Sequence, residues 1–427
     1  MTRSSLRGAV LLAALTTLLL APATASAINP VSFSPAGNMA VGRDGPGAAL
    51  LPDGRVLVVG GYHNPGGVYE SSTEIYNPST NSFSAGPPTP TELYAPAVAS
   101  LPDGRVLIAG GYDGSNIVAR ADVFNPNTGT YSQVGSLLHE RENTGVASLP
   151  DGRVLVVGGY DNSGNSLNTT EIFNPQTNGF SPGPTLPTRR YGPAVASIAG
   201  GRVLVAGGYD SATGDTFDTA FALDSGATTF SPVGSLPAHS YAPVGASLPQ
   251  GRALVAGGYE DPPGDYVTRA LIFDPTTNSF SSAGIGNLSH AAEEAGAIEL
   301  RDGRVLVVGG WNGEALNTAE VLSVPSNSFT SKLKGRKVKL TVTTTGVAQA
   351  TDVSTKVATT ANKKKKKPKL VKTTSKTGGP GTIVVKVKLT KRGSAQLRQK
   401  GKLKVRVVYT PDGGVAATKK LKLRAGK

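Results

Sequence analysis

A segment of about 50 residues recurs six times in this chain, and this repeat constrains the fold more than any other feature. Each copy has an apolar run that ends in two glycines followed by an aromatic residue. The Gly pairs begin at Gly60, Gly110, Gly158, Gly207, Gly257 and Gly309. A period of this size is typical of propellers and solenoid arrays, whose units cannot bury their apolar faces alone.

Each repeat is predicted to contain four β-strands. In the second repeat these are residues 95–101, 105–111, 121–124 and 130–134. A Pro-Asp-Gly turn separates the first two strands, and glycine provides the positive φ that such a turn needs. The chain has 54 Gly and 30 Pro, a composition that favours many turns and an all-β fold. The doubled glycine is expected where neighbouring sheets approach too closely for a Cβ.

Pairs of aromatic residues with six residues between them follow most of the Gly pairs. They are Tyr76 and Phe83, Phe124 and Tyr131, Phe173 and Phe180, and Phe273 and Phe280. With the Gly pairs, this pattern resembles the kelch-repeat β-propellers over residues 31–330. The fourth repeat departs from it with Phe221 and Phe230, and the sixth has Leu322 in place of the first aromatic residue. The resemblance implies a six-bladed kelch propeller over residues 28–330.

Counting strands suggests how such a ring would close. The sequence offers six copies of the first three strands but seven candidates for the fourth. We expect residues 31–34 to pair with the third strand of the last repeat, near residues 319–322. Residues 328–332 would then lead into the C-terminal region.

The first 27 residues have the pattern of a secretory signal peptide. Arg3 and Arg7 precede an apolar run over residues 9–21, and Ala25-Ser26-Ala27 is a small-residue cleavage site. A transmembrane anchor is the alternative, but the run is shorter than the roughly 20 residues that a span needs. The sequence therefore predicts a secreted, extracellular protein without a transmembrane span after cleavage, with association at the cell surface as a further option.

Charge divides the rest of the chain into two parts. Residues 28–330 hold 13 Arg, no Lys and 27 acidic residues, whereas residues 331–427 hold 28 Lys and Arg and two acidic residues. Alternating lysine and apolar residues predict a small basic module similar to a β-sandwich, with a linker near residues 361–368. Its lysines would either solubilise the strands or bind an anionic cell-envelope polymer. Export and a single aromatic residue, Tyr409, argue against nucleic acid.

The candidate binding residues lie at the start of the innermost strands, where they should surround the mouth of a central channel. Sixteen or seventeen residues before the Gly pairs stand Arg43, Asp44, Tyr94, Arg141, Glu142, Arg190, Tyr191, Tyr241 and Glu293. Tyrosine rings stack on sugars, and arginine and carboxylate groups bind hydroxyls. These residues therefore indicate a pocket for a glycan or a peptide, with packing at the channel rim as the alternative.

Other residues typical of catalytic or metal sites give weaker evidence for function. Residues 179–183 match Gly-x-Ser-x-Gly, but on an outer strand and not at a strand-to-helix turn. His139, His239 and His290 lie in the connections that lead into the innermost strands of three different repeats. Surface positions are therefore favoured over a shared metal or acid–base site. The chain has no Cys, which excludes the cysteine-crosslinked tyrosine that galactose oxidase, a kelch propeller, uses with copper. Acids at aligned loop positions, Asp113, Asp161, Asp210 and Glu260, are expected to cap turns rather than bind Ca²⁺.

Taken together, the residues predict a secreted binding scaffold that is galactose oxidase-like in its propeller but lacks the copper site. Its ligand would be a glycan or a protein, with no cofactor, no metal and no catalytic residue assigned. The alternative is an extracellular carbohydrate-active enzyme with its site at the channel mouth, where Glu140 and Glu142, or Glu293 and Glu294, offer pairs of acids.

Overall fold

The computed structural model describes residues 31–64 and 66–323 with their side chains, and seven strands between residues 327 and 424 by their backbone. The predicted signal peptide and the predicted linker at 361–368 lie outside the described residues. In the described part there is no α-helix, only two 3₁₀ turns, η1 (Ala199–Gly201) and η2 (Pro249–Gly251). No helix in this part of the chain is long and apolar enough to cross a membrane. The all-β prediction is confirmed for the described residues.

The repeats form six four-stranded antiparallel sheets, numbered here in chain order. Their innermost strands are β2 (Gly47–Leu50), β8 (Ala97–Ser100), β12 (Gly145–Ser148), β16 (Ala194–Ile198), β23 (Val244–Leu248) and β29 (Gly296–Glu299). The second strands are β3 (Val56–Val59), β9 (Val106–Ala109), β13 (Val154–Val157), β17 (Arg202–Ala206), β24 (Arg252–Ala256) and β30 (Val305–Val308).

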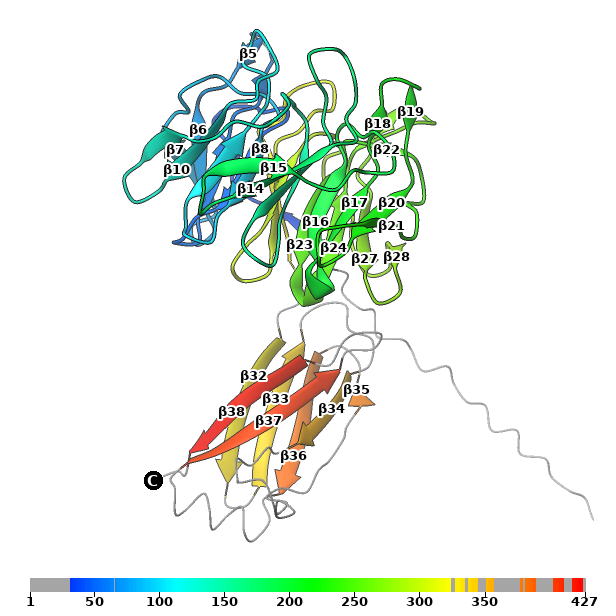
Figure 1. Ribbon diagram of the computed structural model, residues 1–427. Coiled ribbons are helices and arrows are strands. Elements are labelled where there is room, and N and C mark those ends of the chain that lie inside the picture. The colour runs from blue at the N-terminus through cyan, green and yellow to red at the C-terminus, as the bar shows by residue number, and fades with distance from the viewer. Residues whose placement is uncertain are drawn as a thin grey trace, which may run out of the picture.

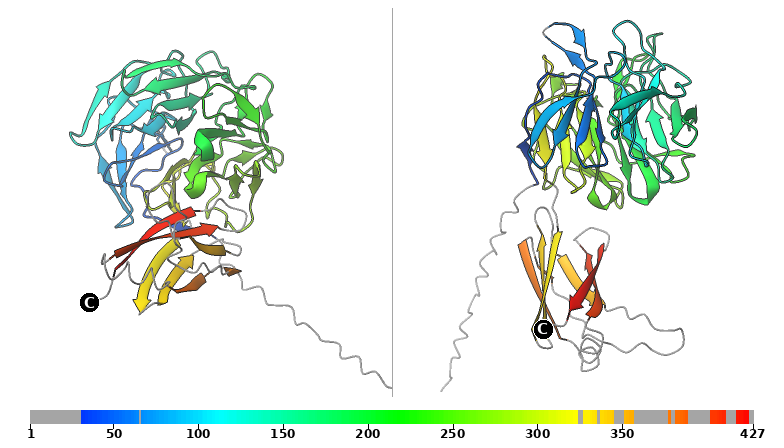
Figure 2. Two further views of the ribbon diagram at one scale, coloured as in Figure 1. Left: turned by 60° about the horizontal axis from the view of Figure 1, so that its bottom comes forward. Right: turned by 90° about the vertical axis from the view of Figure 1, so that its left-hand side faces the viewer.

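Two more strands complete each sheet toward its outer edge. The third strands are β6 (Thr73–Asn77), β10 (Ala121–Asn125), β14 (Thr170–Asn174), β20 (Ala220–Leu223), β27 (Ala270–Asp274) and β31 (Ala319–Leu322). The outer strands are β7 (Ser82–Gly86), β11 (Thr130–Gln133), β15 (Gly179–Pro182), β21 (Phe230–Pro232), β28 (Ser279–Ser281) and, for the sixth sheet, β1 (Phe33–Pro35). The sheets follow one another around a central axis in chain order (Figure 1; Figure 2, left).

The N-terminal strand completes the last sheet, as the strand count predicted. Phe33 pairs with Leu322 and Pro35 with Glu320, so β1 is the outer strand of the sixth sheet. Residues 328–332 belong instead to a C-terminal strand. This pairing joins the two ends of the repeat region, so the sixth sheet has its fourth strand only when both ends are present.

The core lies between neighbouring sheets and not inside any one of them. All four residues of β3, β9, β13 and β30 are buried, because both faces of these strands are covered by adjacent sheets. Val56 and Val58 of the first sheet pack in one cluster with Leu306 and Val308 of the sixth, so the contacts also close the ring. Burial of each such side chain stabilises the fold by about 1.5–3 kcal/mol.

The Gly pairs hold the sheets together, as the sequence suggested. A Cβ on the first glycine of each pair would lie within 2.7 Å of a carbonyl oxygen of the next sheet. The amide of the second glycine donates to that same carbonyl. These bonds run from Gly61 to Leu93 (2.8 Å) through to Gly310 and Arg43 (2.8 Å), which links the sixth sheet to the first. Glycine is required here by contact as well as by its positive φ.

Short separate sheets of two or three strands lie at one end of the ring, in the connections between the main strands. They are β4 (Tyr62–His63) with β5 (Val68–Tyr69), β18 (Tyr209–Asp210) with β19 (Asp215–Thr216), and β22 (Ser240–Tyr241) with β25 (Tyr259–Glu260) and β26 (Asp265–Tyr266). The turns that follow the innermost strands lie at the other end: Pro-Asp-Gly in the first three repeats, η1 and η2 in the fourth and fifth, and Arg301-Asp302-Gly303 in the sixth. We call the first end the hairpin end and the second the turn end.

The C-terminal strands form two further sheets (Figure 1). One contains β32 (Asn327–Lys334), β33 (Lys337–Thr344) and β36 (Gly381–Lys388). The other contains β34 (Thr351–Lys356), β35 (Thr377–Gly378), β37 (Lys402–Thr410) and β38 (Ala417–Arg424). Lysine or arginine alternates with apolar residues along β33, β37 and β38.

Candidate functional site

Six aligned residues narrow the central channel at the hairpin end. They stand fifteen residues before each Gly pair, all have φ between +47° and +64°, and we call them the axial ring: Gly45, Ala95, Asn143, Gly192, Ala242 and Glu294. Backbone hydrogen bonds of 3.0–3.1 Å join five of the six neighbouring pairs in this ring, such as Ala95 N to Gly45 O and Gly45 N to Glu294 O. The left-handed backbone conformation at these residues directs a backbone amide toward the neighbouring residue of the ring.

Two side chains of the axial ring close the channel. Asn143 Nδ2 donates to Glu294 Oε1, although the two residues belong to the third and sixth sheets. The hydroxyls of Tyr94 and Tyr241 also donate to the Glu294 carboxylate. Burial raises the pKa of Glu294, and these three donors partly offset that effect by favouring the ionised form. The sequence did not single out Asn143, and it singled out Glu294 only as a partner of Glu293.

A cavity of about 560 Å³ lies inside the ring, between this closed end and the turn end. Its wall is formed mostly by small residues of the innermost strands, and Glu294 lies at its closed end. The predicted mouth is therefore wrong in one respect: the candidate residues surround the closed end of the channel, and the cavity extends away from them toward the turns.

Beyond the axial ring, aromatic side chains cover the hairpin end. The residue sixteen positions before each Gly pair is paired, through a backbone β-bridge, with the aromatic residue that follows the Gly pair. The pairs are Asp44 with Tyr62, Tyr94 with Tyr112, Glu142 with Tyr160, Tyr191 with Tyr209, Tyr241 with Tyr259, and Glu293 with Trp311. With Tyr69 and Tyr266 these make ten of the 13 tyrosines and the only tryptophan of the chain. We call this surface the tyrosine face.

The rings of the tyrosine face contact one another in two groups. Tyr69 lies 4.9 Å from Tyr112 and 5.2 Å from Tyr62, measured between ring centroids. On the other side, Tyr191 lies 5.1 Å from Tyr241 and 5.2 Å from Tyr160. All these tyrosines are partly exposed as residues, and Tyr191 and Tyr241 are the most enclosed, since burial raises their pKa values. Partly exposed, mutually supported tyrosines are typical of binding surfaces, because little side-chain freedom is lost when a ligand is bound.

The acids of this face are buried enough to hold their protons at unusually high pH. Burial, with the nearby charges of Glu294 and Glu293, raises the pKa of Asp44 to about 9. Burial and the charge of Glu294 raise the pKa of Glu293 to about 8 and that of Glu142 to about 7. The three residues predicted from the sequence therefore do lie together, around Glu294.

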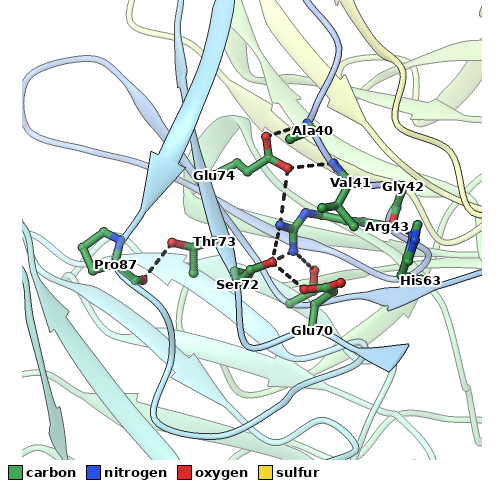
Figure 3. A network of polar contacts seen from close by, with 11 residues as sticks. Ala40, Val41, Gly42, Arg43, His63, Glu70, Ser72, Thr73, Glu74 and Pro87 are labelled. Carbon is green, nitrogen blue, oxygen red and sulfur yellow. Dashed lines mark hydrogen bonds and ion pairs between the residues drawn. The ribbon is translucent and has the colours of Figure 1, made fainter. Parts of the chain in front are cut away.

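The three candidate arginines do not face the channel, which corrects the prediction for Arg43, Arg141 and Arg190. Each is fully buried. The Arg43 guanidinium donates to the carbonyls of Gly60 (2.7 Å) and Ser72 (3.0 Å) and lies 3.4 Å from Glu74 (Figure 3). Burial lowers its pKa, and Glu74 partly offsets this effect.

The other two arginines repeat this arrangement with different partners. Arg141 lies 2.8 Å from Glu171, whereas Arg190 has its guanidinium 4.5 Å from the centre of the Phe217 ring. Successive side chains of an extended chain point in opposite directions. Each arginine directly precedes a residue whose side chain belongs to the tyrosine face. The arginine side chain therefore points the opposite way, into the protein interior.

The remaining candidates have structural partners. Asp113, Asp161 and Asp210 accept backbone hydrogen bonds within their loops, as predicted, and Glu260 pairs with Arg269 at 2.6 Å. His290 lies 3.3 Å from Glu320. Among the described residues, no group of three or more His, Cys, Asp or Glu side chains is arranged to hold a metal ion.

Comparison with protein families agrees with this repeat architecture. Three segments of the chain match the Kelch motif, at residues 46–90, 94–138 and 146–187. These are the first three repeats, and they support a kelch-repeat protein with a propeller-like all-β fold. No curated protein matches the chain.

Proposed function

We propose that this protein is a secreted, six-bladed kelch propeller that acts as a non-catalytic binding scaffold. The tyrosine face supports the proposal most directly, because it gathers almost all the tyrosines at one end of the ring and leaves them partly exposed. Kelch repeats suggest a protein-interaction role, and the tyrosine rings would equally stack on a glycan. The ligand-contacting residues would include Asp44, Glu142 and Glu293 but not the buried arginines.

Binding assays on the mature full-length chain test this proposal. Arrays of glycans and peptides would identify ligands, and the Tyr112→Ala/Tyr209→Ala variant would remove a ring from each aromatic group. Arg105→Ala, at the turn end, is the matched control. We expect the double variant to lose binding and the control to retain it. Equal binding by all three proteins would overturn the assignment of the tyrosine face.

A catalytic role is the second candidate, and the raised pKa values of Glu142 and Glu293 favour it. A carboxyl that keeps its proton near neutral pH can act as a general acid. Each glycan that binds should therefore be incubated with the protein and examined for cleavage. Turnover that Glu142→Gln or Glu293→Gln abolishes would replace the scaffold with a carbohydrate-active enzyme.

We further propose that residues 331–427 form a basic β-sandwich-like module that attaches the protein to an anionic cell-envelope polymer. The strand register supports this, because lysines stand directly opposite one another: Lys332, Lys339 and Lys386 form one row across β32, β33 and β36. Like charges in such positions destabilise a sheet unless an anion neutralises them.

Cosedimentation with cell envelopes across a salt series tests this tether. Binding should weaken steeply as salt rises, since the Debye length is only about 10 Å at 0.1 M. Lys339→Glu/Lys386→Glu should weaken binding, and Arg55→Glu/Arg105→Glu, in the repeats, should leave it unchanged. Salt-independent binding, or none in dilute buffer, would contradict the tether.

A further inference from the structure

The charges of the repeat region are strongly segregated between its two ends. The connections that build the hairpin end are residues 36–44, 62–72, 86–94, 112–120, 135–142, 160–169, 183–191, 209–219, 233–241, 259–269, 284–294 and 311–318. Together they carry 16 acidic residues and six arginines, a formal net charge of −10, or −8 when Asp44 and Glu293 hold their protons. The turns at the other end, residues 51–55, 77–82, 101–105, 125–130, 149–153, 174–179, 198–202, 224–229, 248–252, 274–279 and 299–304, carry seven acidic residues and seven arginines, a net charge of 0.

The arginines of the hairpin end do little to neutralise its surface. Arg43, Arg141 and Arg190 are fully buried and bonded within the wall. Arg120 pairs with Asp122 at 2.6 Å, and Arg269 pairs with Glu260. Since five of the six cations are already occupied, the field over the tyrosine face is negative.

Within this face, the junction of the first and sixth sheets has carboxylates without partners. Asp44 is only 9% exposed, and neither its Oδ1 nor Glu293 Oε2 has a hydrogen-bond donor. Both acids lie close enough to Glu294 for its charge to raise their pKa values. A buried carboxylate oxygen without a donor is costly, and a nearby cation would reduce that cost.

Aromatic rings stand beside these unpartnered acids. Asp44 bridges Tyr62 and Glu293 bridges Trp311, whose rings lie 6.5 Å apart. The Tyr266 phenol also lies near both acids, whose charges contribute to its raised pKa, and near Trp311. Faces of Trp and Tyr attract ammonium and guanidinium groups, and Arg binds carboxylates at the same time. The combination of rings and carboxylates therefore selects an organic cation over an anion.

We infer that the tyrosine face binds an arginine- or lysine-rich segment of a partner protein, with one cationic side chain at the Asp44–Glu293 junction. This inference rests on the proposed binding function and names its ligand class. The complementary charge also explains why the acids of this face outnumber its arginines by 16 to six. As the cation approaches, the acids release their protons, so binding should strengthen as the pH rises from 6 to 9.

Calorimetric titration of the full-length protein with an arginine–glycine repeat peptide, at 0.15 M salt, tests the inference. Arginine stays charged throughout this pH range, so only the protein titrates. Asp44→Asn/Glu293→Gln should weaken binding about tenfold or more and remove its pH dependence. Asp53→Asn/Asp103→Asn, at the turn end, removes the same number of carboxyl groups and should have little effect.

Four results would overturn the inference. Equal loss in both double variants would mean that the peptide responds only to net charge. Neutral glycans that bind the tyrosine face in place of the peptide would leave the scaffold proposal intact but contradict the cationic ligand. Salt-sensitive self-association of the chain, abolished when Lys363 to Lys367 are replaced by Gln, would make the chain's own basic region the occupant instead of a partner protein. Failure of every glycan and peptide to bind would remove the proposed function as well.

Discussion

The side chains of Asn143 and Glu294 meet across the central channel, although 151 residues and half of the ring separate them. They occupy equivalent positions in the third and sixth repeats, where the other repeats have Gly or Ala. Together with the hydroxyls of Tyr94 and Tyr241, they join opposite sheets through one carboxylate. This contact separates the cavity inside the ring from the tyrosine face.

Replacing Glu294 by Ala should destabilise the protein by about 2 kcal/mol or more. The change leaves the buried donors of Asn143, Tyr94 and Tyr241 without their shared acceptor. The backbone should tolerate it, because Ala95 and Ala242 adopt the same positive φ at equivalent positions. Urea unfolding measures the loss, with Glu294→Gln as the milder variant. An Ala variant as stable as the parent would mean that the network contributes little.

Stability should fall as the pH rises from about 5 to 9. The pKa values of Asp44, Glu142 and Glu293 are raised in the folded protein to about 9, 7 and 8. The folded state therefore holds protons that the unfolded chain has already lost, and their contribution to stability disappears as the pH passes through these values. Thermal unfolding should show a melting temperature several degrees lower at pH 9 than at pH 6. Asp44→Asn/Glu293→Gln should flatten this profile, and a melting temperature that rises with pH in the parent would contradict the raised pKa values.

Two glycines of the fourth repeat allow the energetic cost of a close contact to be measured apart from the cost of backbone strain. Gly207 (φ +67°) would place a Cβ 2.7 Å from the carbonyl oxygen of Ser240, whereas Gly214 (φ +78°) faces open space. Gly214→Ala should therefore cost about 1 kcal/mol from φ alone. Gly207→Ala should cost at least about 2 kcal/mol more, since it also forces neighbouring sheets apart. Similar melting curves for the two variants would argue against close contact as the reason for the Gly pairs.

Arg141 should act through the fold and not through the ligand. Its removal leaves the Glu171 carboxylate buried and unpaired, so Arg141→Ala should lower the free energy of unfolding by about 3–5 kcal/mol. Arg190→Ala should cost less, because aromatic rings and not a carboxylate face its guanidinium. Chemical denaturation compares the two. A folded Arg141→Ala protein that has lost ligand binding would restore this arginine to the site.

The repeat made most of the fold predictable from the sequence. The Gly pairs, the four strands of each unit and the pairing of residues 31–34 with the last repeat all follow from one aligned period and a strand count. Six residues of the predicted site also lie together, because aligned positions in a ring occupy equivalent places.

The errors have physical causes. Arg43, Arg141 and Arg190 precede bridging residues, and alternation along extended chain directs them into the wall. Asn143 and Glu294 appear in only two repeats, so an alignment of the repeats treats them as exceptions, and their contact depends on which sheets stand opposite. The aromatic residues after the Gly pairs form a recognisable motif in the sequence. Only their backbone pairing with the residues sixteen positions before the Gly pairs shows that both sets form one surface, the tyrosine face.

Hydrogen exchange of the full-length protein with and without the arginine–glycine peptide tests the central claim, that ligands bind at the tyrosine face, most directly. The account predicts slower exchange in the loops that carry Tyr62, Tyr112 and Trp311 and at residues 293–294. Exchange at the Pro-Asp-Gly turns and in β32–β38 should remain unchanged. Protection confined to those turns or strands, with none at the hairpin end, would contradict the account.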